Sequence, residues 1–319
     1  MGAYFVRRLL WAPVTIILVS IVCFLAVRFV PGNAIDLIQA EMSSVSTEPV
    51  DRAAIEHAMG LDVPVYVQYG RWVDNIVIHG SLGASLVGTD NITQEMVSSI
   101  PVTLELGILA VIIGIVISIP IGIYASIRQD TITDHVGRSI AIILISVPSF
   151  WLGTMIMIYP SIWWGWSPPV QYIPFVNDPI GNLRMLIIPS IVLGATLTGS
   201  SMRMTRTMML EILRQDYMRT AWAKGLTERV IVIRHAVKNA LIPVITIIGM
   251  QLPLIIGGSV IIEQIFDLPG MGRLMLAALQ QRDYPLVQGI NLVVSVFIIF
   301  VNLFVDMSYG WLDPRIHYQ

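Results

Sequence analysis

The chain has 319 residues, of which 55% are hydrophobic and only 13% are charged, and its net charge is −2. Soluble domains carry roughly 25% charged residues, so this composition excludes a soluble globular protein, and no basic–aromatic pattern suggests a nucleic-acid partner. The single cysteine, Cys23, excludes a disulfide within the chain and a cysteine-based metal site.

Six uncharged stretches are long enough to cross a membrane. Each reaches or approaches the roughly 20 residues needed to cross about 30 Å of hydrocarbon, and none shows the alternation typical of a membrane β-barrel. They are Leu9–Val27, Leu106–Ile127, Ser139–Ile158, Met185–Met202, Asn239–Ile262 and Pro285–Val305. The sequence therefore predicts an all-α polytopic membrane protein with six transmembrane helices.

Residues 1–30 hold the N-terminus and the first span, and residues 31–100 are expected to form a small external segment before the core of residues 101–319. Ser46 or Thr47, followed by Pro49, can start a helix that Gly60 ends. The acidic excess of this segment could attract a cationic ligand or the basic rim of a partner, but a solvated external surface is the simpler interpretation. A second, amphipathic helix is expected because four apolar residues share one face: Val65, Tyr69, Trp72 and Ile76.

A basic segment at about residues 203–240 separates the fourth span from the fifth. Inside it we predict a short helix, because Asp216 can cap a first turn with its side-chain oxygen and Gly225 can close the helix in the left-handed conformation. About eight helical residues, roughly 12 Å, are too few to cross a bilayer. The flanking stretches, Met204–Leu213 and Arg229–Lys238, are expected to be helices that act as stiff levers into the membrane.

The short helix carries a pattern that favours docking on a protein partner. Arg219 and Lys224 are expected on its surface, and Tyr217, Met218 and Trp222 are expected to be apolar anchors. Trp and Arg side chains buried at the centre of an interface can dominate its binding energy. The alternative is a helix held on the membrane surface by anionic lipid, which the basic excess also fits.

The fifth span contains residues that disfavour an uninterrupted apolar helix: Gln251, Pro253, Gly257, Gly258 and Ser259. Pro and Gly inside a span free backbone groups that a neighbouring helix or a water-filled cavity must satisfy. Small residues also permit close helix packing. The two interpretations, a cavity and a close helix contact, have equal weight from the sequence.

Lysine and arginine are distributed unevenly between alternate loops. With the N-terminus inside, thirteen lie in cytoplasmic segments and five in outer segments. Because cytoplasmic loops carry the excess of positive charge, the sequence predicts that both termini lie inside. The cores of the spans are essentially free of charge, which disfavours a proton-coupled carrier.

Motifs for enzymatic chemistry are missing from the sequence. It has no phosphate-binding loop of the G-x-x-x-x-G-K-S/T type, no H-E-x-x-H motif and no G-x-S-x-G nucleophile elbow. The five histidines are scattered through loops. We therefore expect a protein that is not an enzyme, holds no cofactor or metal and does not hydrolyse ATP alone.

The short basic helix and several other segments resemble the permease subunits of ATP-binding-cassette importers. Their cytoplasmic loop carries the pattern E-A-A-x-x-x-G, and this chain reads Arg219-Thr220-Ala221-Trp222-Ala223-Lys224-Gly225, with Arg219 in place of the Glu and Thr220 in place of the first Ala. That departure is similar to the dipeptide/oligopeptide branch of the family. Further matching segments, in the same order as in that branch, are Arg28-Phe29-Val30-Pro31-Gly32, Gly80-Ser81-Leu82-Gly83-Ala84-Ser85, Pro101-Val102-Thr103-Leu104-Glu105-Leu106, Pro148-Ser149-Phe150-Trp151-Leu152-Gly153, Asp283-Tyr284-Pro285-Leu286-Val287-Gln288-Gly289 and Leu312-Asp313-Pro314-Arg315.

The resemblance implies a type I importer transmembrane fold and ATP-driven uptake of di- or oligopeptides through a pore of which this chain forms half. The implied partners are a second permease subunit, two cytoplasmic ATPases that bind ATP and magnesium, an external substrate-binding protein and membrane lipid. The implied location is the cell membrane, which the chain crosses several times. Relatives also carry nickel complexes, glutathione, haem or oligosaccharides, and a stand-alone channel or proton-coupled carrier is a remote alternative.

Two sets of residues follow from the resemblance. The ATPase-docking helix, called a coupling helix in this family, comprises Asp216, Tyr217, Met218, Arg219, Thr220, Ala221, Trp222, Lys224, Gly225 and Leu226. The translocation path is expected to contain Ser149, Phe150, Gln251, Gly257, Gly258 and Ser259.

Overall fold

The computed structural model describes residues 2–28, 62–85, 91–165, 169 and 171–312. Within these residues the structure is helical, and the only extended pairing is an isolated bridge between Ala84 and Asn91. The first helices are α1 (Gly2–Arg28), α4 (Val65–Val77), α5 (Ile92–Ile127), α6 (Ile132–Ser146), α7 (Ser149–Trp164) and α8 (Pro179–Leu213). They are followed by α9 (Asp216–Ala223), α10 (Glu228–Val230), the π-helical stretch η1 (Ile231–Val237), α11 (Lys238–Ile265), α12 (Met271–Gln281) and α13 (Tyr284–Leu312).

Five helices in the described part of the chain are long and apolar enough to cross a membrane. They are Arg7–Arg28, Ile92–Ile127, Pro179–Leu213, Glu228–Ile265 and Tyr284–Val305, and they contain five of the six predicted stretches. The prediction of one continuous helix over Ser139–Ile158 was wrong, because this stretch is divided between α6 and α7, which are bent by 96° relative to each other. The described residues give six spans if this bent pair counts as one.

Pro148 explains the bend between α6 and α7. Proline disfavours the α-helical conformation of the residue before it, and Val147 is extended, with φ −83° and ψ 121°. Pro148 itself has φ −61° and ψ 132°, after which α7 begins at Ser149. The apolar composition of this stretch thus predicted enough length for a span, but Pro148 divides the stretch into two helices.

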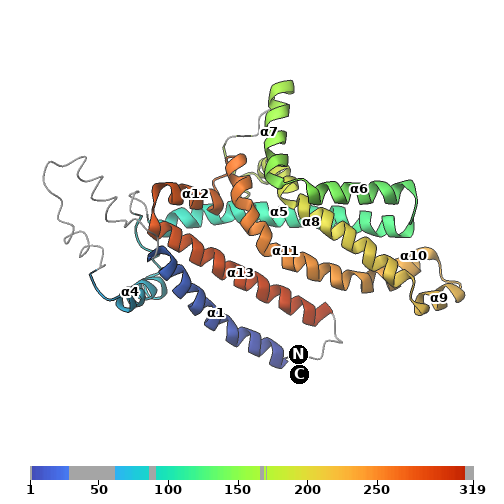
Figure 1. Cartoon of the computed structure of the whole chain (residues 1–319), viewed down its shortest axis with the longest axis horizontal. Helices are drawn as coiled ribbons and strands as arrows, with labels where there is room; N and C mark the ends of the chain where they lie inside the picture. The colour runs from blue at the N-terminus through green and yellow to red at the C-terminus, as the bar shows by residue number, and fades with distance from the viewer. Residues whose placement is uncertain (1, 29–61, 86–90, 166–168, 170, 313–319) are drawn as a thin grey trace. The chain divides into compact units, whose positions relative to one another are not determined.

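Of the described residues, one compact unit contains 101–165, 169 and 171–273, together with 2–6 and 300–312. Its central helix is α8, whose most apolar part is 56% buried, against 28% for the most apolar parts of α5 and of the continuous stretch Glu228–Ile265 that contains α11. Figure 1 shows α8 beside α6 and α11, with α7 turning away from α6. The core of this unit joins residues of α5 (Val102, Leu106, Ala110), α8 (Leu186, Val192, Leu193, Leu197) and α11 (Val244, Ile248, Ile255, Ile262).

Glycines of α8 bring neighbouring helices into close contact in this unit. A Cβ added at Gly194 would lie 2.6 Å from the carbonyl oxygen of Ala110 in α5, and one at Gly199 would lie 2.7 Å from that of Ala141 in α6. Small residues at such positions let helix backbones approach closely in membranes. The close packing of α5 and α6 on α8 therefore requires residues without a side chain at Gly194 and Gly199.

The second compact unit contains the described residues 7–28, 62–85, 91–100 and 274–299. In it α4 packs on α1: the ring of Phe24 lies 5.4 Å from that of Tyr69 and 5.7 Å from that of Trp72, and the Ser20 hydroxyl lies 2.8 Å from the Tyr69 hydroxyl. The predicted amphipathic helix is confirmed, although Val65 lies off the packed face and is exposed. The helix predicted between Ser46 and Gly60 lies outside the described residues.

The fifth predicted span is continuous in the structure. α11 runs through Pro243 and Pro253 without a break. The irregularity lies instead before α11, in η1, where seven residues form a π-helical stretch. π-helical turns are rare and occur frequently at functional sites, and η1 lies in the segment that joins α9 to α11.

Candidate functional site

The start of α9 differs from the prediction by one residue. Gln215 is extended, with φ −69° and ψ 151°, and it is the N-cap, without a side-chain capping bond. Asp216 is the first helical residue, its side chain is 97% exposed, and its Oδ1 lies 3.5 Å from Nη1 of Arg219. The prediction that Asp216 caps the helix was therefore wrong, although an acidic residue in the first turn still favours the helix dipole.

The end of α9 agrees with the prediction. The helix has eight residues, and Gly225 follows it with a φ of 75°. The N–H of Lys224 donates to the Thr220 carbonyl at 3.1 Å, and the N–H of Gly225 donates to the Trp222 carbonyl at 3.0 Å. Nothing lies within 4 Å of a Cβ added at Gly225, so the need for glycine comes from the backbone conformation and not from lack of space.

One face of α9 is buried against the rest of its unit. Met218 and Ala221, three residues apart, pack with Met209 of α8 and with Ile231 and Ala236 of η1. Met218 is completely buried. The prediction that Met218 anchors a partner was wrong, because this side chain fixes α9 to the helices on either side of it.

The rest of the α9 surface is exposed, including the two rings that flank the buried face, although the Tyr217 hydroxyl accepts a hydrogen bond from Asn239 Nδ2 at 3.3 Å. Tyr217 is 45% exposed and Trp222 is 48% exposed, and the Arg219 side chain is 79% exposed. The other docking residues predicted from the sequence, Thr220, Lys224 and Leu226, are also exposed. α9 is thus fixed to its unit by Met218 and Ala221, while two aromatic rings and a guanidinium on it remain exposed.

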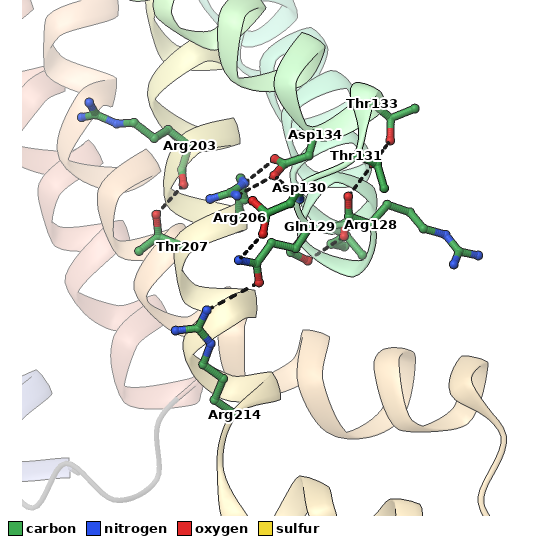
Figure 2. Close-up of polar contacts among 12 residues, drawn as sticks. Arg128, Gln129, Asp130, Thr131, Thr133, Asp134, Arg203, Arg206, Thr207 and Arg214 are labelled. Atoms are coloured by element: carbon green, nitrogen blue, oxygen red, sulfur yellow. Dashed lines mark hydrogen bonds and ion pairs between the residues drawn. The ribbon is translucent and has the colours of Figure 1, made fainter.

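A buried ion pair lies near the end of α8 (Figure 2). Asp134 of α6 is fully buried, and Arg206 of α8 binds it with two parallel contacts, Nε to Oδ1 at 2.6 Å and Nη2 to Oδ2 at 2.7 Å. The N–H of Asp130 adds a third hydrogen bond to Asp134 Oδ2, at 3.0 Å. Such bidentate, charge-assisted geometry is the strong form of an ion pair.

The same cluster ties the turn between α5 and α6 to the last turn of α8. Asp130 adopts a φ of 61°, which is uncommon for a non-glycine residue, and Arg214 reaches Gln129 Oε1 at 3.5 Å, a weak contact. Figure 2 shows Gln129, Asp130 and Asp134 gathered on one side and Arg206 and Arg214 on the other. The cluster therefore holds α6 to the end of α8 that leads into α9.

Sequence reasoning missed this pair. It treated Arg206 only as one of the basic residues that set orientation and did not single out Asp134. The two residues are 72 positions apart, so no local pattern joins them. The sequence holds only an indirect signal for the pair. Asp134 precedes the third apolar stretch and Arg206 follows the fourth, so the two opposite charges are expected at the same level of a helix bundle.

The residues predicted for the translocation path fall into two environments. Ser259 is buried and donates to the Ile256 carbonyl at 2.8 Å, and a Cβ at Gly258 would touch Leu193 of α8 at 3.4 Å, so both serve helix packing. The Gln251 side chain bonds the Ser200 hydroxyl of α8 at 3.0 Å. By contrast, Gly257, Ser149 and Phe150 keep accessible surface, and Phe150 is 51% exposed.

Two carboxylates at the other end of this unit were also missed. Glu263 accepts hydrogen bonds from Thr103 Oγ1 at 2.7 Å, from the N–H of Gly272 at 2.7 Å and from the N–H of Arg273 at 3.0 Å. Because it bonds the first free N–H groups of α12, Glu263 acts as a cap for that helix. It fixes the turn between α11 and α12.

Glu105 organises the loop between α7 and α8. Its Oε2 accepts from the Tyr172 hydroxyl at 2.7 Å and from Asn182 Nδ2 at 2.8 Å. Burial, together with the hydrogen bond to Glu105, raises the pKa of Tyr172. Glu105 and Glu263 are therefore both structural acceptors with described donors.

Two family models match the chain. The one described as "binding-protein-dependent transport system inner membrane component" matches residues 118–318, and the corresponding N-terminal model matches residues 1–107. The chain belongs to this permease family. The resemblance inferred from α9 and the other segments is confirmed, and the two matched ranges cover the described helices except for residues 108–117 in the middle of α5.

Individual relatives of this permease cover its whole length. A protein of Brucella suis with the provisional name of peptide transport system permease protein is 40% identical over 100% of both chains. The dipeptide transport system permease protein of Escherichia coli is 36% identical, with 99% of each chain covered. The protein of the same name from Alkalihalophilus pseudofirmus is 37% identical, with 100% of both covered.

A solved structure confirms the fold of the permease. A chain from the crystal structure of an amino acid ABC transporter with histidines superposes with a TM-score of 0.52, at 14% identity, and covers 69% of this chain and 94% of that one. The all-α importer transmembrane fold is therefore established. Membership in the family and the apolar helices make the permease a multi-pass plasma-membrane protein, a transport component and not an enzyme.

Proposed function

We propose that this permease is one subunit of an ATP-driven importer of di- or oligopeptides and that α9 is its docking site for a cytoplasmic ATPase. The observation that carries the docking proposal is the two-sided structure of α9. Met218 and Ala221 fix the helix to α8 and η1, while Tyr217, Arg219 and Trp222 face outward. Aromatic and arginine side chains are the residues that most often dominate binding energy at protein interfaces. The peptide substrate is supported by the names of the full-length relatives.

The permease supplies half of the pore in this proposal. A second, related permease subunit supplies the other half, an external binding protein delivers the substrate, and two ATPases bind ATP and magnesium. The accessible residues of the predicted path, Ser149, Phe150 and Gly257, would line the route, and Gln251, Gly258 and Ser259 would hold α11 against α8.

Movement of the ATPases would reach the membrane through packed contacts. When ATP closes the ATPase pair, each docked α9 is displaced. Met218 lies in one apolar cluster with Met209 of α8 and Ile231 of η1, which continues into α11. A displacement of α9 would therefore move both α8 and α11. The Asp134–Arg206 ion pair makes α6 follow α8. Alternating access then results from rigid movement of these helices.

The proposed orientation places both termini and α9 on the cytoplasmic side, on the basis of the lysine and arginine distribution. In a Cys23→Ser background, a single cysteine at Asn91 should react with an impermeant thiol reagent from outside. One at Thr227 should react only after the cells are opened, since both positions are exposed. Labelling of Thr227→Cys in intact cells would overturn the orientation.

A proton-coupled carrier fits the site less well. Such a carrier needs a buried ionisable group that exchanges protons with the path. The fully buried Asp134 and Glu263 each have three described donors, from Arg206 and Asp130 in the first case and from Thr103 and the start of α12 in the second. They are engaged in holding helices together.

The docking proposal is tested by two variants of the reconstituted importer. Gly225→Val forces a β-branched residue into the left-handed conformation, which costs roughly 1–2 kcal/mol, and shifts the exit of α9. Arg219→Glu reverses a charge on the exposed face. Both should reach the membrane at normal levels and lose most of the ATP hydrolysis that loaded binding protein stimulates.

Arg71→Glu is the matched control for the charge reversal, because Arg71 is an exposed arginine on α4, far from α9 in the sequence. It should hydrolyse ATP like the wild type. If Gly225→Val and Arg219→Glu also hydrolyse ATP and take up substrate at the wild-type rate, α9 is not the docking site, whatever the importer carries.

A further inference from the structure

A small cavity lies between α5, α6 and α8, at the end of the bundle that holds the Asp134–Arg206 pair. Its volume is about 220 Å³. This is smaller than the roughly 300–1,000 Å³ of typical sites for drug-sized molecules, so the cavity does not suit a peptide. It is large enough for a single headgroup or a small anion.

The polar wall of the cavity is basic. It includes Arg138 of α6 and Arg203, Arg206 and Thr207 of α8. Arg206 is held in place by Asp134, and Figure 2 shows Arg203 projecting from the preceding turn of α8, away from that ion pair. Within the described part of the chain, the guanidinium groups of Arg138 and Arg203 make no hydrogen bond, although Arg138 lies close enough to Asp134 to interact with its charge.

These charges are not balanced by the described residues around the cavity. Asp134 is already bound on both oxygens by Arg206, and Asp130 is the other carboxylate of the adjoining turn. Three guanidinium groups facing two carboxylates leave the cavity net positive. A planar guanidinium that is not hydrogen-bonded to a carboxylate is well suited to binding a phosphate through two donors.

The other wall of the cavity is apolar. It is formed by small and aliphatic side chains of three helices, among them Ala125 of α5, Ala141 and Ile142 of α6 and Met202 of α8. Ile142 is 58% exposed, as is its neighbour Ile143. The cavity therefore opens beside an apolar surface of α6. One of its walls is basic and the other is aliphatic.

The position of the cavity in the sequence places it at the edge of the membrane. Arg138 directly precedes the apolar stretch Ser139–Ile158, Arg203 directly follows Met185–Met202, and Ala125 lies near the end of Leu106–Ile127. Three apolar stretches thus begin or end around one cavity. The boundary between hydrocarbon and headgroups must lie at this level, whichever way the chain is oriented.

We propose that this cavity binds the phosphate-bearing headgroup of an anionic phospholipid, with Arg138 and Arg203 as its ligands and the acyl chains lying along Ile142 of α6. Basic cavities between transmembrane helices at the headgroup level are suited to such lipids. The bound lipid would bridge α6 and α8 beside the Asp134–Arg206 pair. The proposal is independent of the peptide substrate and of ATPase docking.

The test is native mass spectrometry of the full chain in detergent, titrated with phosphatidylglycerol and with phosphatidylcholine of the same acyl chains. The wild type should bind phosphatidylglycerol more tightly. Arg138→Gln/Arg203→Gln should weaken that binding by about thirtyfold, because each basic residue near the surface contributes roughly fivefold. Its affinity for phosphatidylcholine should stay the same, and Arg138→Lys/Arg203→Lys should recover part of the loss.

Arg229→Gln/Arg234→Gln is the matched control, since it removes two exposed arginines that do not line the cavity. It should bind phosphatidylglycerol like the wild type. Equal losses in both double variants would mean non-specific attraction and would overturn the proposal, as would a wild type that binds the two lipids equally. Displacement of phosphatidylglycerol by an equimolar concentration of inorganic phosphate would show a small-anion site instead and also contradict it.

Discussion

Replacing Asp134 with alanine should lower the stability of the chain by about 3–5 kcal/mol, since removing one partner of a buried ion pair leaves the other charge uncompensated. Arg206 is 17% exposed and loses two hydrogen bonds to a carboxylate that is fully buried. The expected result is a lower midpoint of thermal unfolding in detergent and a lower amount of protein in the membrane.

Two further variants separate the ion pair from a general effect of the substitution. Asp216→Ala makes the same change at an exposed ion pair, whose side chains are 97% and 79% exposed, and should leave the midpoint unchanged. Asp134→Leu/Arg206→Met removes both charges and should recover most of the stability. If Asp134→Ala unfolds at the wild-type temperature, Asp134 and Arg206 are not a buried pair.

Gly194→Ala should be a damaging small substitution in the core. The new Cβ would lie 2.6 Å from the Ala110 carbonyl oxygen, so α5 and α8 would have to separate. Overpacking of this kind costs typically about 1–3 kcal/mol. The expected result is a reduced unfolding midpoint together with reduced transport, because α8 also carries α9.

Gly257→Ala provides the comparison for Gly194→Ala. It is the same change in another spanning helix, but nothing lies within 4 Å of the added Cβ. Since alanine is a better helix former than glycine by up to about 1 kcal/mol, this variant should be as stable as the wild type or more so. Equal damage by both substitutions would show that close packing of α5 on α8 is not what Gly194 provides.

The parts of the fold that depend on local composition and on the backbone preferences of single residues were predictable. Uncharged stretches gave the spans because hydrocarbon excludes charge, and Gly225 gave the end of α9 because few other residues adopt a positive φ. The same local rules, applied to Pro148, would have predicted the bend between α6 and α7. The length of an apolar stretch alone does not reveal such a bend.

The side-chain roles that depend on tertiary packing were not predictable. Met218 is an apolar residue of the kind that often anchors an interface. In the structure, however, residues of α8 and η1, which precede and follow α9, cover it. Asp134 and Arg206, like Thr103 and Glu263, lie far apart in the chain and meet only once the bundle has formed. A charge next to an apolar stretch could be a solvated residue or half of a buried pair, and the sequence alone does not distinguish them.

The ion pair and the apolar cluster together suggest how far a displacement of α9 would travel. Met218 joins α9 to both long helices of its unit, and the buried pair joins α8 to α6. Coupling requires elements that move as packed bodies between two arrangements. We therefore expect that variants of Asp134 that still fold will reduce transport more than they reduce binding of the ATPase.

Uptake of a labelled dipeptide into proteoliposomes tests the central claim, ATP-driven peptide import, most directly. The vesicles should contain this permease, its partner permease and the ATPases, with the binding protein outside and ATP inside. We predict that the peptide accumulates above its external concentration only when ATP and every partner are present. Equilibration without ATP, or accumulation driven by a proton gradient alone, would contradict the account.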